Sequence, residues 1–91
     1  MENYFKSSLE KVLKEVSSVL IEKNNKYGDS ALNPIRVFSN QSSIEQLKVR
    51  IDDKLKRIQN QSDDEDEDVI LDLIGYLVLL RIALSKKARG K

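Results

Sequence analysis

The stretch from Asp63 to Leu84 constrains the fold more than any other part of the chain. Six consecutive acids, DDEDED, run directly into a segment in which almost every residue is apolar, VILDLIGYLVLLRIAL. A helix that is apolar around most of its circumference has to be buried on several sides. Helical periodicity places Gly75 and Tyr76 on the same face as Asp72, while Val, Ile and Leu side chains cover the other faces. We therefore predict a helix over about 65–86 that lies at the centre of the fold.

Asp72 is the one carboxylate within this apolar helix. A carboxylate that loses its water needs a positive or hydrogen-bonding partner, because burying it alone costs several kcal/mol. That partner is a basic side chain, a backbone end or a metal ion. We expect a cation from the preceding helix rather than a metal.

The length and composition of the chain limit both its core and its chemistry. With 91 residues it forms one small domain, residues 1–91, and a core of that size is marginal, which favours a homo-oligomer. The absence of cysteine removes disulfides and thiolate chemistry, and the absence of histidine removes the commonest transition-metal ligand. Any bound metal is therefore expected to be a hard, oxygen-coordinated ion such as Mg²⁺.

The charge and hydropathy patterns argue against nucleic-acid and membrane partners. Sixteen basic and 15 acidic residues give a net charge of +1, so the chain has no overall field that would attract a nucleic acid. The N-terminus lacks an apolar signal core, and Asp72 and Arg81 interrupt an apolar run that is shorter than the roughly 20 residues a bilayer needs. These patterns predict a cytoplasmic protein.

The rest of the chain predicts two more main helices and one short one. An apolar stripe indicates a helix over about 4–27, followed by Gly28 as a left-handed C-cap. Asn33 and Pro34 form a good N-cap and first-turn pair for a short helix over about 34–39. Ser42 or Ser43 opens a helix over about 43–60. Its predicted core positions are Ile44, Leu47, Ile51, Leu55 and Ile58. This helix and the helix over 65–86 are expected to form an antiparallel hairpin, giving an all-α fold with three main helices in an oligomeric assembly.

Some basic side chains have no obvious structural role in this scheme. Arg50 and Lys54 are like charges four residues apart, an unfavourable pair on a bare helix unless anions face it. Arg50, Asp53 and Arg57 can also form an ordinary ladder of ion pairs along the helix. Tyr27 and Tyr76 lie on core-facing stripes, where a tyrosine either packs or stacks on a ligand. The candidate ligand-binding residues are Lys26, Tyr27, Arg36, Arg50, Lys54, Arg57 and Tyr76.

Three blocks of the sequence, KYGDSALNPIRVFS, VRIDDKLKRI and DEDEDVILDLIGYL, resemble a known family. It comprises small phage and bacterial proteins related to the nucleotide-modification-associated branch of the MazG-like all-α nucleoside triphosphate pyrophosphohydrolases. The resemblance covers about residues 21–84. It implies an α-helical, usually oligomeric protein with a nucleotide site between helices, and a location in the host cytoplasm if the protein is phage-encoded.

The metal-binding pattern of the related enzymes is incomplete in this chain. In those enzymes an E-x-x-E pair on one helix and an E-x-x-D pair on another hold Mg²⁺ against the phosphates. If Asp72 matches the aspartate of E-x-x-D, Val69 stands at the glutamate position, and Glu15 and Glu22 of the first helix are seven residues apart. A magnesium site would instead use Asp68 and Asp72, helped by Asp52 or Asp53.

These features lead to three functional hypotheses. The first is a protein that binds and sequesters a nucleotide-derived small molecule without turning it over, such as a phage sponge for a nucleotide immune signal of the host. The second is a Mg²⁺-dependent nucleoside triphosphate pyrophosphohydrolase. The third is a structural or regulatory helical module that binds only protein. The incomplete carboxylate pairs favour the first hypothesis, so no catalytic residue is assigned.

Overall fold

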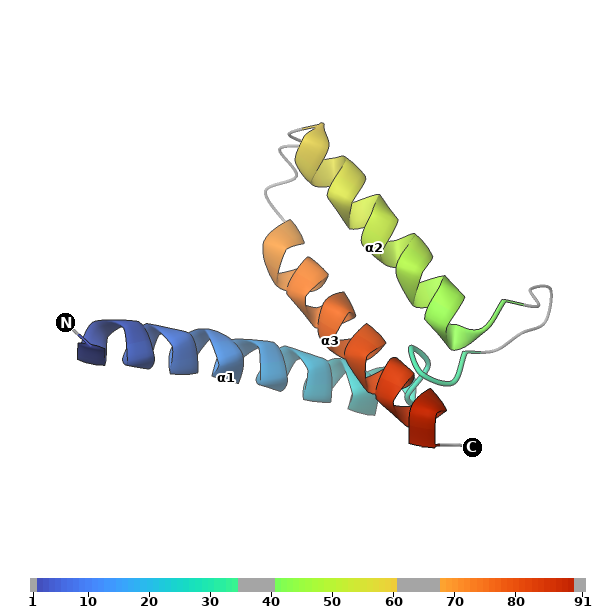
Figure 1. The fold of residues 1–91 in the computed structure, drawn as a ribbon, viewed down its shortest axis with the longest axis horizontal. Coiled ribbons are helices and arrows are strands. Elements are labelled where there is room, and N and C mark those ends of the chain that lie inside the picture. The colour runs from blue at the N-terminus through green and yellow to red at the C-terminus, as the bar shows by residue number, and fades with distance from the viewer. Residues whose placement is uncertain (1, 35–40, 61–67, 90–91) are drawn as a thin grey trace.

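The computed structural model describes residues 2–34, 41–60 and 68–89, which form three α-helices and contain no strand (Figure 1). The helices are α1 (Glu2–Tyr27), α2 (Ser43–Gln59) and α3 (Val69–Arg89). This confirms the predicted all-α architecture with three main helices. The short helix expected over 34–39 falls almost wholly outside the described residues.

Side-chain caps explain where α2 and α3 begin. Of the two candidate serines, Ser42 is the N-cap of α2, because its hydroxyl accepts a hydrogen bond from the Glu45 amide at 3.2 Å. At α3, Asp68 Oδ1 accepts from the Leu71 amide at 3.0 Å. Asp68 is therefore the N-cap of α3, which begins at Val69. The predicted start of this helix at about residue 65 lies outside the described residues.

The end of α1 is fixed by a left-handed turn. Gly28 has φ 61°, as predicted for a C-cap, and the next residue, Asp29, also has a positive φ of 64°. The Asp29 amide donates to the Asn24 carbonyl at 3.2 Å, the closing bond of a Schellman cap. The Asp29 carbonyl then accepts from the amides of Leu32 (3.2 Å) and Asn33 (2.9 Å). The chain after α1 is thus folded into a compact turn around Asp29.

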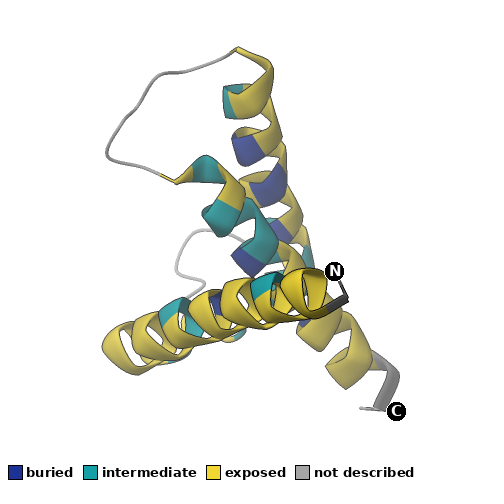
Figure 2. Cartoon of the chain, turned by 90° about the vertical axis from the view of Figure 1, so that its left-hand side faces the viewer, coloured by how far each residue is buried: buried dark blue, intermediate teal, exposed yellow. Residues whose placement is uncertain are grey.

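Helices α2 and α3 lie side by side and run in opposite directions, in agreement with the predicted hairpin, and α1 crosses α3 (Figures 1 and 2). Leu47 and Ile51 of α2 are buried, as their spacing predicted. Leu55 and Ile58 are 50% and 40% exposed, so the predicted core seam of α2 is covered over only part of its length. The reason is that α1 crosses the hairpin away from the C-terminal end of α2.

The crossing of α1 and α3 is close because α3 has a glycine there. A Cβ atom built on Gly75 would lie 3.3 Å from Leu20 Cδ2, which is tighter than an ordinary van der Waals contact. Val16 of α1 and Ala83 of α3 are also buried. The absence of a side chain at Gly75 therefore allows Leu20 of α1 to pack near the α3 backbone.

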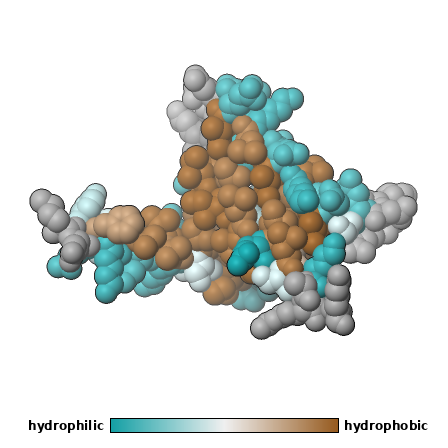
Figure 3. All heavy atoms as spheres, viewed as in Figure 1, coloured by the Kyte–Doolittle hydropathy of each residue, from teal (hydrophilic) through white to brown (hydrophobic). Residues whose placement is uncertain are grey.

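A single chain leaves much of its apolar surface uncovered. Its accessible surface is 7701 Å², whereas a compact monomer of this mass is expected to expose about 5,400 Å². The radius of gyration is 15.1 Å, compared with about 12 Å for a compact domain of this length. Hydrophobic atoms occupy a broad area over α2 and α3 (Figure 3). Among the described residues, no helix combines the length and the hydrophobicity that crossing a bilayer requires.

Candidate functional site

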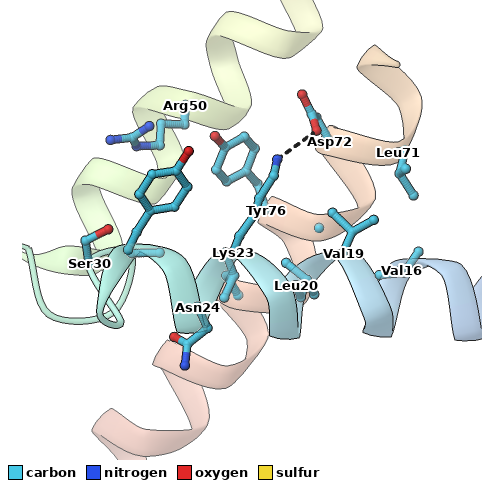
Figure 4. A pocket seen from close by; sticks show the side chains of 14 residues that line it. Val16, Val19, Leu20, Lys23, Asn24, Ser30, Arg50, Leu71, Asp72 and Tyr76 are labelled. Atoms are coloured by element: carbon cyan, nitrogen blue, oxygen red, sulfur yellow. Dashed lines mark hydrogen bonds and ion pairs between the residues drawn. The ribbon is translucent and has the colours of Figure 1, made fainter. Parts of the chain in front are cut away.

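A cavity of about 430 Å³ lies where α1, α3 and the turn after α1 meet, with Arg50 of α2 at its edge (Figure 4). Its volume is within the range of small-molecule sites in proteins. Its lining combines an apolar floor with a small set of polar groups. The lining residues are Val16, Val19, Leu20, Lys23, Asn24, Tyr27, Ser30, Ala31, Arg50, Leu71, Asp72, Gly75, Tyr76 and Leu79.

The local structure explains why these residues meet. Tyr27 is the last residue of α1, and the turn around Asp29 brings Ser30 back toward the helix end. Tyr76 follows Gly75, which lies against Leu20 of α1. Because Gly75 has no side chain, the wall of the cavity at the helix crossing is formed by backbone and by Leu20.

Asp72 joins all three helices through ion pairs at the cavity wall. Its Oδ2 lies 3.5 Å from Nζ of Lys54 on α2, and its Oδ1 lies 3.5 Å from Nζ of Lys23 on α1. The Asp72 side chain is 22% exposed and that of Lys54 is 10% exposed. Lys54 is therefore the cation of the second helix that was expected to meet Asp72. The cluster of Lys23, Lys54 and Asp72 provides a polar connection between helices whose other contacts are mainly apolar.

The electrostatic balance of the cavity favours an anionic ligand. Lys23 and Arg50 line it together with a single acid, Asp72, and Lys54 adds a further positive charge behind that acid. Figure 4 shows Arg50 reaching in from α2 on the side of the cavity where Ser30 lies. The guanidinium and the hydroxyl both offer hydrogen-bond donors to phosphate or carboxylate oxygens.

The residues singled out from the sequence fall into three groups in the structure. Tyr27, Arg50 and Tyr76 line the cavity. Lys26 and Lys54 lie next to lining residues: Lys26 Nζ is 5.4 Å from the centroid of the Tyr27 ring, and Lys54 contacts Asp72.

The remaining two candidates are Arg57 and Arg36. Arg57 Nε pairs with Asp53 Oδ2 at 3.4 Å on α2, which is one pair of the helix ladder considered as the alternative. Arg36 lies outside the described residues.

Three polar lining residues were missed by the sequence analysis: Lys23, Asn24 and Ser30. Lys23 lies one helical turn before Tyr27, so the two share a face of α1, and this spacing was a usable signal. Asn24 and Ser30 had no such signal, because their positions depend on how α1 crosses α3 and how the chain turns at Asp29.

The two carboxylates considered for magnesium already have partners in the structure. Asp68 Oδ1 accepts a hydrogen bond from the Leu71 amide, and both oxygens of Asp72 are paired with lysines. Over residues 2–34, 41–60 and 68–89, no group of three potential metal ligands comes together. A metal at Asp68 and Asp72 would have to displace these contacts.

Comparison with known proteins adds no relative from which a function can be transferred. No family model matches the chain, and neither the curated proteins nor the solved structures contain a match. The site is therefore interpreted from its own geometry.

Proposed function

We propose that this protein binds and sequesters a nucleotide-type small molecule, in which a planar ring system carries one or more phosphates. The observation that carries the proposal is the convergence of Tyr27, Tyr76 and Arg50, from three different helices, on one cavity of about 430 Å³. Aromatic rings provide surfaces on which a base stacks, and a guanidinium binds phosphate oxygens in a bidentate manner. The apolar floor formed by Val16, Val19 and Leu20 suits the ring system rather than the phosphates.

Binding without turnover is supported by the state of the carboxylates. Metal-dependent hydrolysis of a triphosphate needs carboxylate oxygens that are available to hold Mg²⁺ against the phosphates. The Asp72 oxygens are instead engaged by Lys23 and Lys54. A sequestering protein needs only to bind its ligand tightly. The cationic and aromatic side chains that line the cavity are suited to binding.

The proposal extends to the biological setting and the assembly. The resemblance of the three sequence blocks to the nucleotide-modification-associated MazG-like proteins agrees with a nucleotide ligand. In an infected cell, sequestration by a phage-encoded protein of this kind would act as a sponge for a nucleotide signal of host defence. The working form is proposed to be a homo-oligomer, since one chain leaves large apolar side chains such as Ile70 and Leu77 exposed.

The test is binding of AMP, ATP and a cyclic dinucleotide, measured by isothermal titration calorimetry in the presence of EDTA. The wild-type protein should bind at least one of them. Arg50→Ala should weaken that binding by about ten- to a hundredfold, because a charge-assisted hydrogen bond to phosphate contributes roughly 1.5 to 3 kcal/mol. Tyr76→Ala should weaken it by a similar factor through lost stacking.

Lys87→Ala is the matched control for a lost positive charge, because Lys87 is exposed near the C-terminal end of α3 and does not line the cavity. Its affinity should equal that of the wild type. If Arg50→Ala and Lys87→Ala bind equally well, the cavity is not the ligand site. Release of pyrophosphate from ATP in the presence of Mg²⁺ would favour the pyrophosphohydrolase over the sequestering protein.

A further inference from the structure

A second feature of α3 lies outside the cavity. Ile70, Leu73, Leu77, Leu80 and Leu84 follow one another at spacings of three and four residues, the pattern of a coiled-coil seam. Ile70, Leu77 and Leu84 are 57%, 48% and 44% exposed, and Leu73 and Leu80 are half-buried. The cavity is lined by a different face of α3, which carries Asp72, Gly75, Tyr76 and Leu79. The helix thus has one face for the candidate site and another that is apolar and largely uncovered.

We infer that this seam packs against the same seam of a second copy of the chain, with the two α3 helices antiparallel. This inference names the surface for the self-association included in the proposed function, and it does not depend on the ligand. In a two-fold symmetric dimer the same surface of both copies meets, so that surface has to be complementary to itself. The α3 helix of a second copy can complete the knobs-into-holes packing, because Ile and Leu side chains at these spacings pack against the same side chains of an identical helix.

The surface area of the chain supports a second copy as the occupant. The chain exposes 7701 Å², which exceeds by about 2,300 Å² the value expected for a compact monomer of this mass. A stable interface needs only about 800 Å² from each partner. The excess is therefore large enough for a dimer interface.

The charges at the two ends of α3 favour the antiparallel arrangement. Asp68 is exposed at the N-terminal end, and Lys86 and Lys87 are exposed at the C-terminal end. In an antiparallel pair each acidic end lies beside the basic end of the other copy, and the two helix dipoles oppose each other favourably. A parallel pair would place like charges beside each other at both ends.

Sedimentation velocity at micromolar concentration tests the interface. The wild-type chain should sediment as a dimer or a larger oligomer, and Leu77→Glu should raise its dissociation constant at least about a hundredfold, because each dimer would have to bury two carboxylates. Val49→Glu and Leu13→Glu are matched controls, since these apolar residues are 55% and 57% exposed on α2 and α1. A monomeric wild type, or an α1 or α2 control that dissociates the oligomer while Leu77→Glu leaves it intact, would overturn the inference.

Cross-linking tests the orientation without relying on a folded Leu77 variant. The chain contains no cysteine, so Ile70→Cys and Leu84→Cys each introduce a unique thiol. A bismaleimide that bridges one helical turn should link the two variants when they are mixed and should link neither variant efficiently to itself. Efficient self-linking of Ile70→Cys would show that the helices are parallel or that a different surface mediates assembly. Because Leu77→Glu acts on assembly and Arg50→Ala acts on the ligand, failure of one proposal can be distinguished from failure of the other.

Discussion

At the scale of single residues, Asp72 connects the stability of the fold to the candidate site. Its two oxygens are shared between Lys23 of α1 and Lys54 of α2, and Lys54 is among the least exposed charged side chains of the described residues. A buried cation that loses its counter-ion costs more than the pair contributed. Lys54 therefore acts in positioning Asp72, in addition to any effect it has on a ligand.

Asp72→Asn should lower the free energy of unfolding by about 2 kcal/mol, because the amide keeps the volume of the carboxylate but loses the negative charge that pairs with Lys23 and Lys54. Thermal denaturation with and without Mg²⁺ measures this change. The loss should be the same in both conditions. Asp53→Asn is the control, since Asp53 pairs with Arg57 on the exposed part of α2 and its loss should cost less than 1 kcal/mol. A Mg²⁺-dependent stability difference at Asp72 would indicate that this aspartate binds metal.

At the scale of helices, the approach of α1 to α3 at Gly75 sets the shape of the cavity. Gly75→Ala should be nearly neutral, because the tight contact with Leu20 Cδ2 at 3.3 Å involves a flexible side chain, and alanine gains about 1 kcal/mol of helix propensity over glycine. Gly75→Val should lower the free energy of unfolding by about 2 kcal/mol, because its branched side chain forces the helices apart.

Chemical denaturation compares these two variants, with Ser85→Val as the control for the helix propensity of valine at an exposed position of α3. We expect a higher free energy of unfolding for Gly75→Ala than for Gly75→Val, and a value close to that of the wild type for Ser85→Val. If Gly75→Val were as stable as Ser85→Val, α1 would not pack against α3 in the described way.

The helices themselves are the part of the structure that the sequence predicted best. The caps at Gly28 and Ser42, the burial of Leu47 and Ile51, and the face of α3 that carries Asp72 and Tyr76 all follow from local spacing. The crossing of α1 over α3 did not, because no periodicity records which faces of two amphipathic helices meet. For that reason the sequence indicates Tyr27, Arg50 and Tyr76 as separate candidates and not as parts of one cavity. The places of Asn24 and Ser30 in the cavity lining are visible only in the folded chain.

At the scale of the whole molecule, the uneven coverage of apolar surface is the dominant property. The hairpin of α2 and α3 forms most of the contacts between helices, while the first half of α1 extends away from it (Figure 1). Tyr4 and Phe5 near the start of α1 are 78% and 70% exposed. If the chain dimerises through α3 as inferred, its stability should rise with protein concentration, because a dimer would bury apolar surface that a monomer exposes.

The projecting half of α1 has a consequence for motion. Backbone amides in a helix without tertiary support open by fraying, whereas amides in the packed hairpin exchange only through larger unfolding events. Amides from Asn3 to Val12 should thus lose their protons to deuterated solvent much sooner than those around Leu47 and Ile51, as followed by hydrogen exchange with mass spectrometry. Equal protection along α1 would mean that another surface covers its first three turns. If the amides at the start of α1 exchange sooner, the chain would combine a slowly exchanging hairpin with an α1 arm that opens readily at its N-terminal end, and Tyr27 of the cavity lies at the opposite end of that arm.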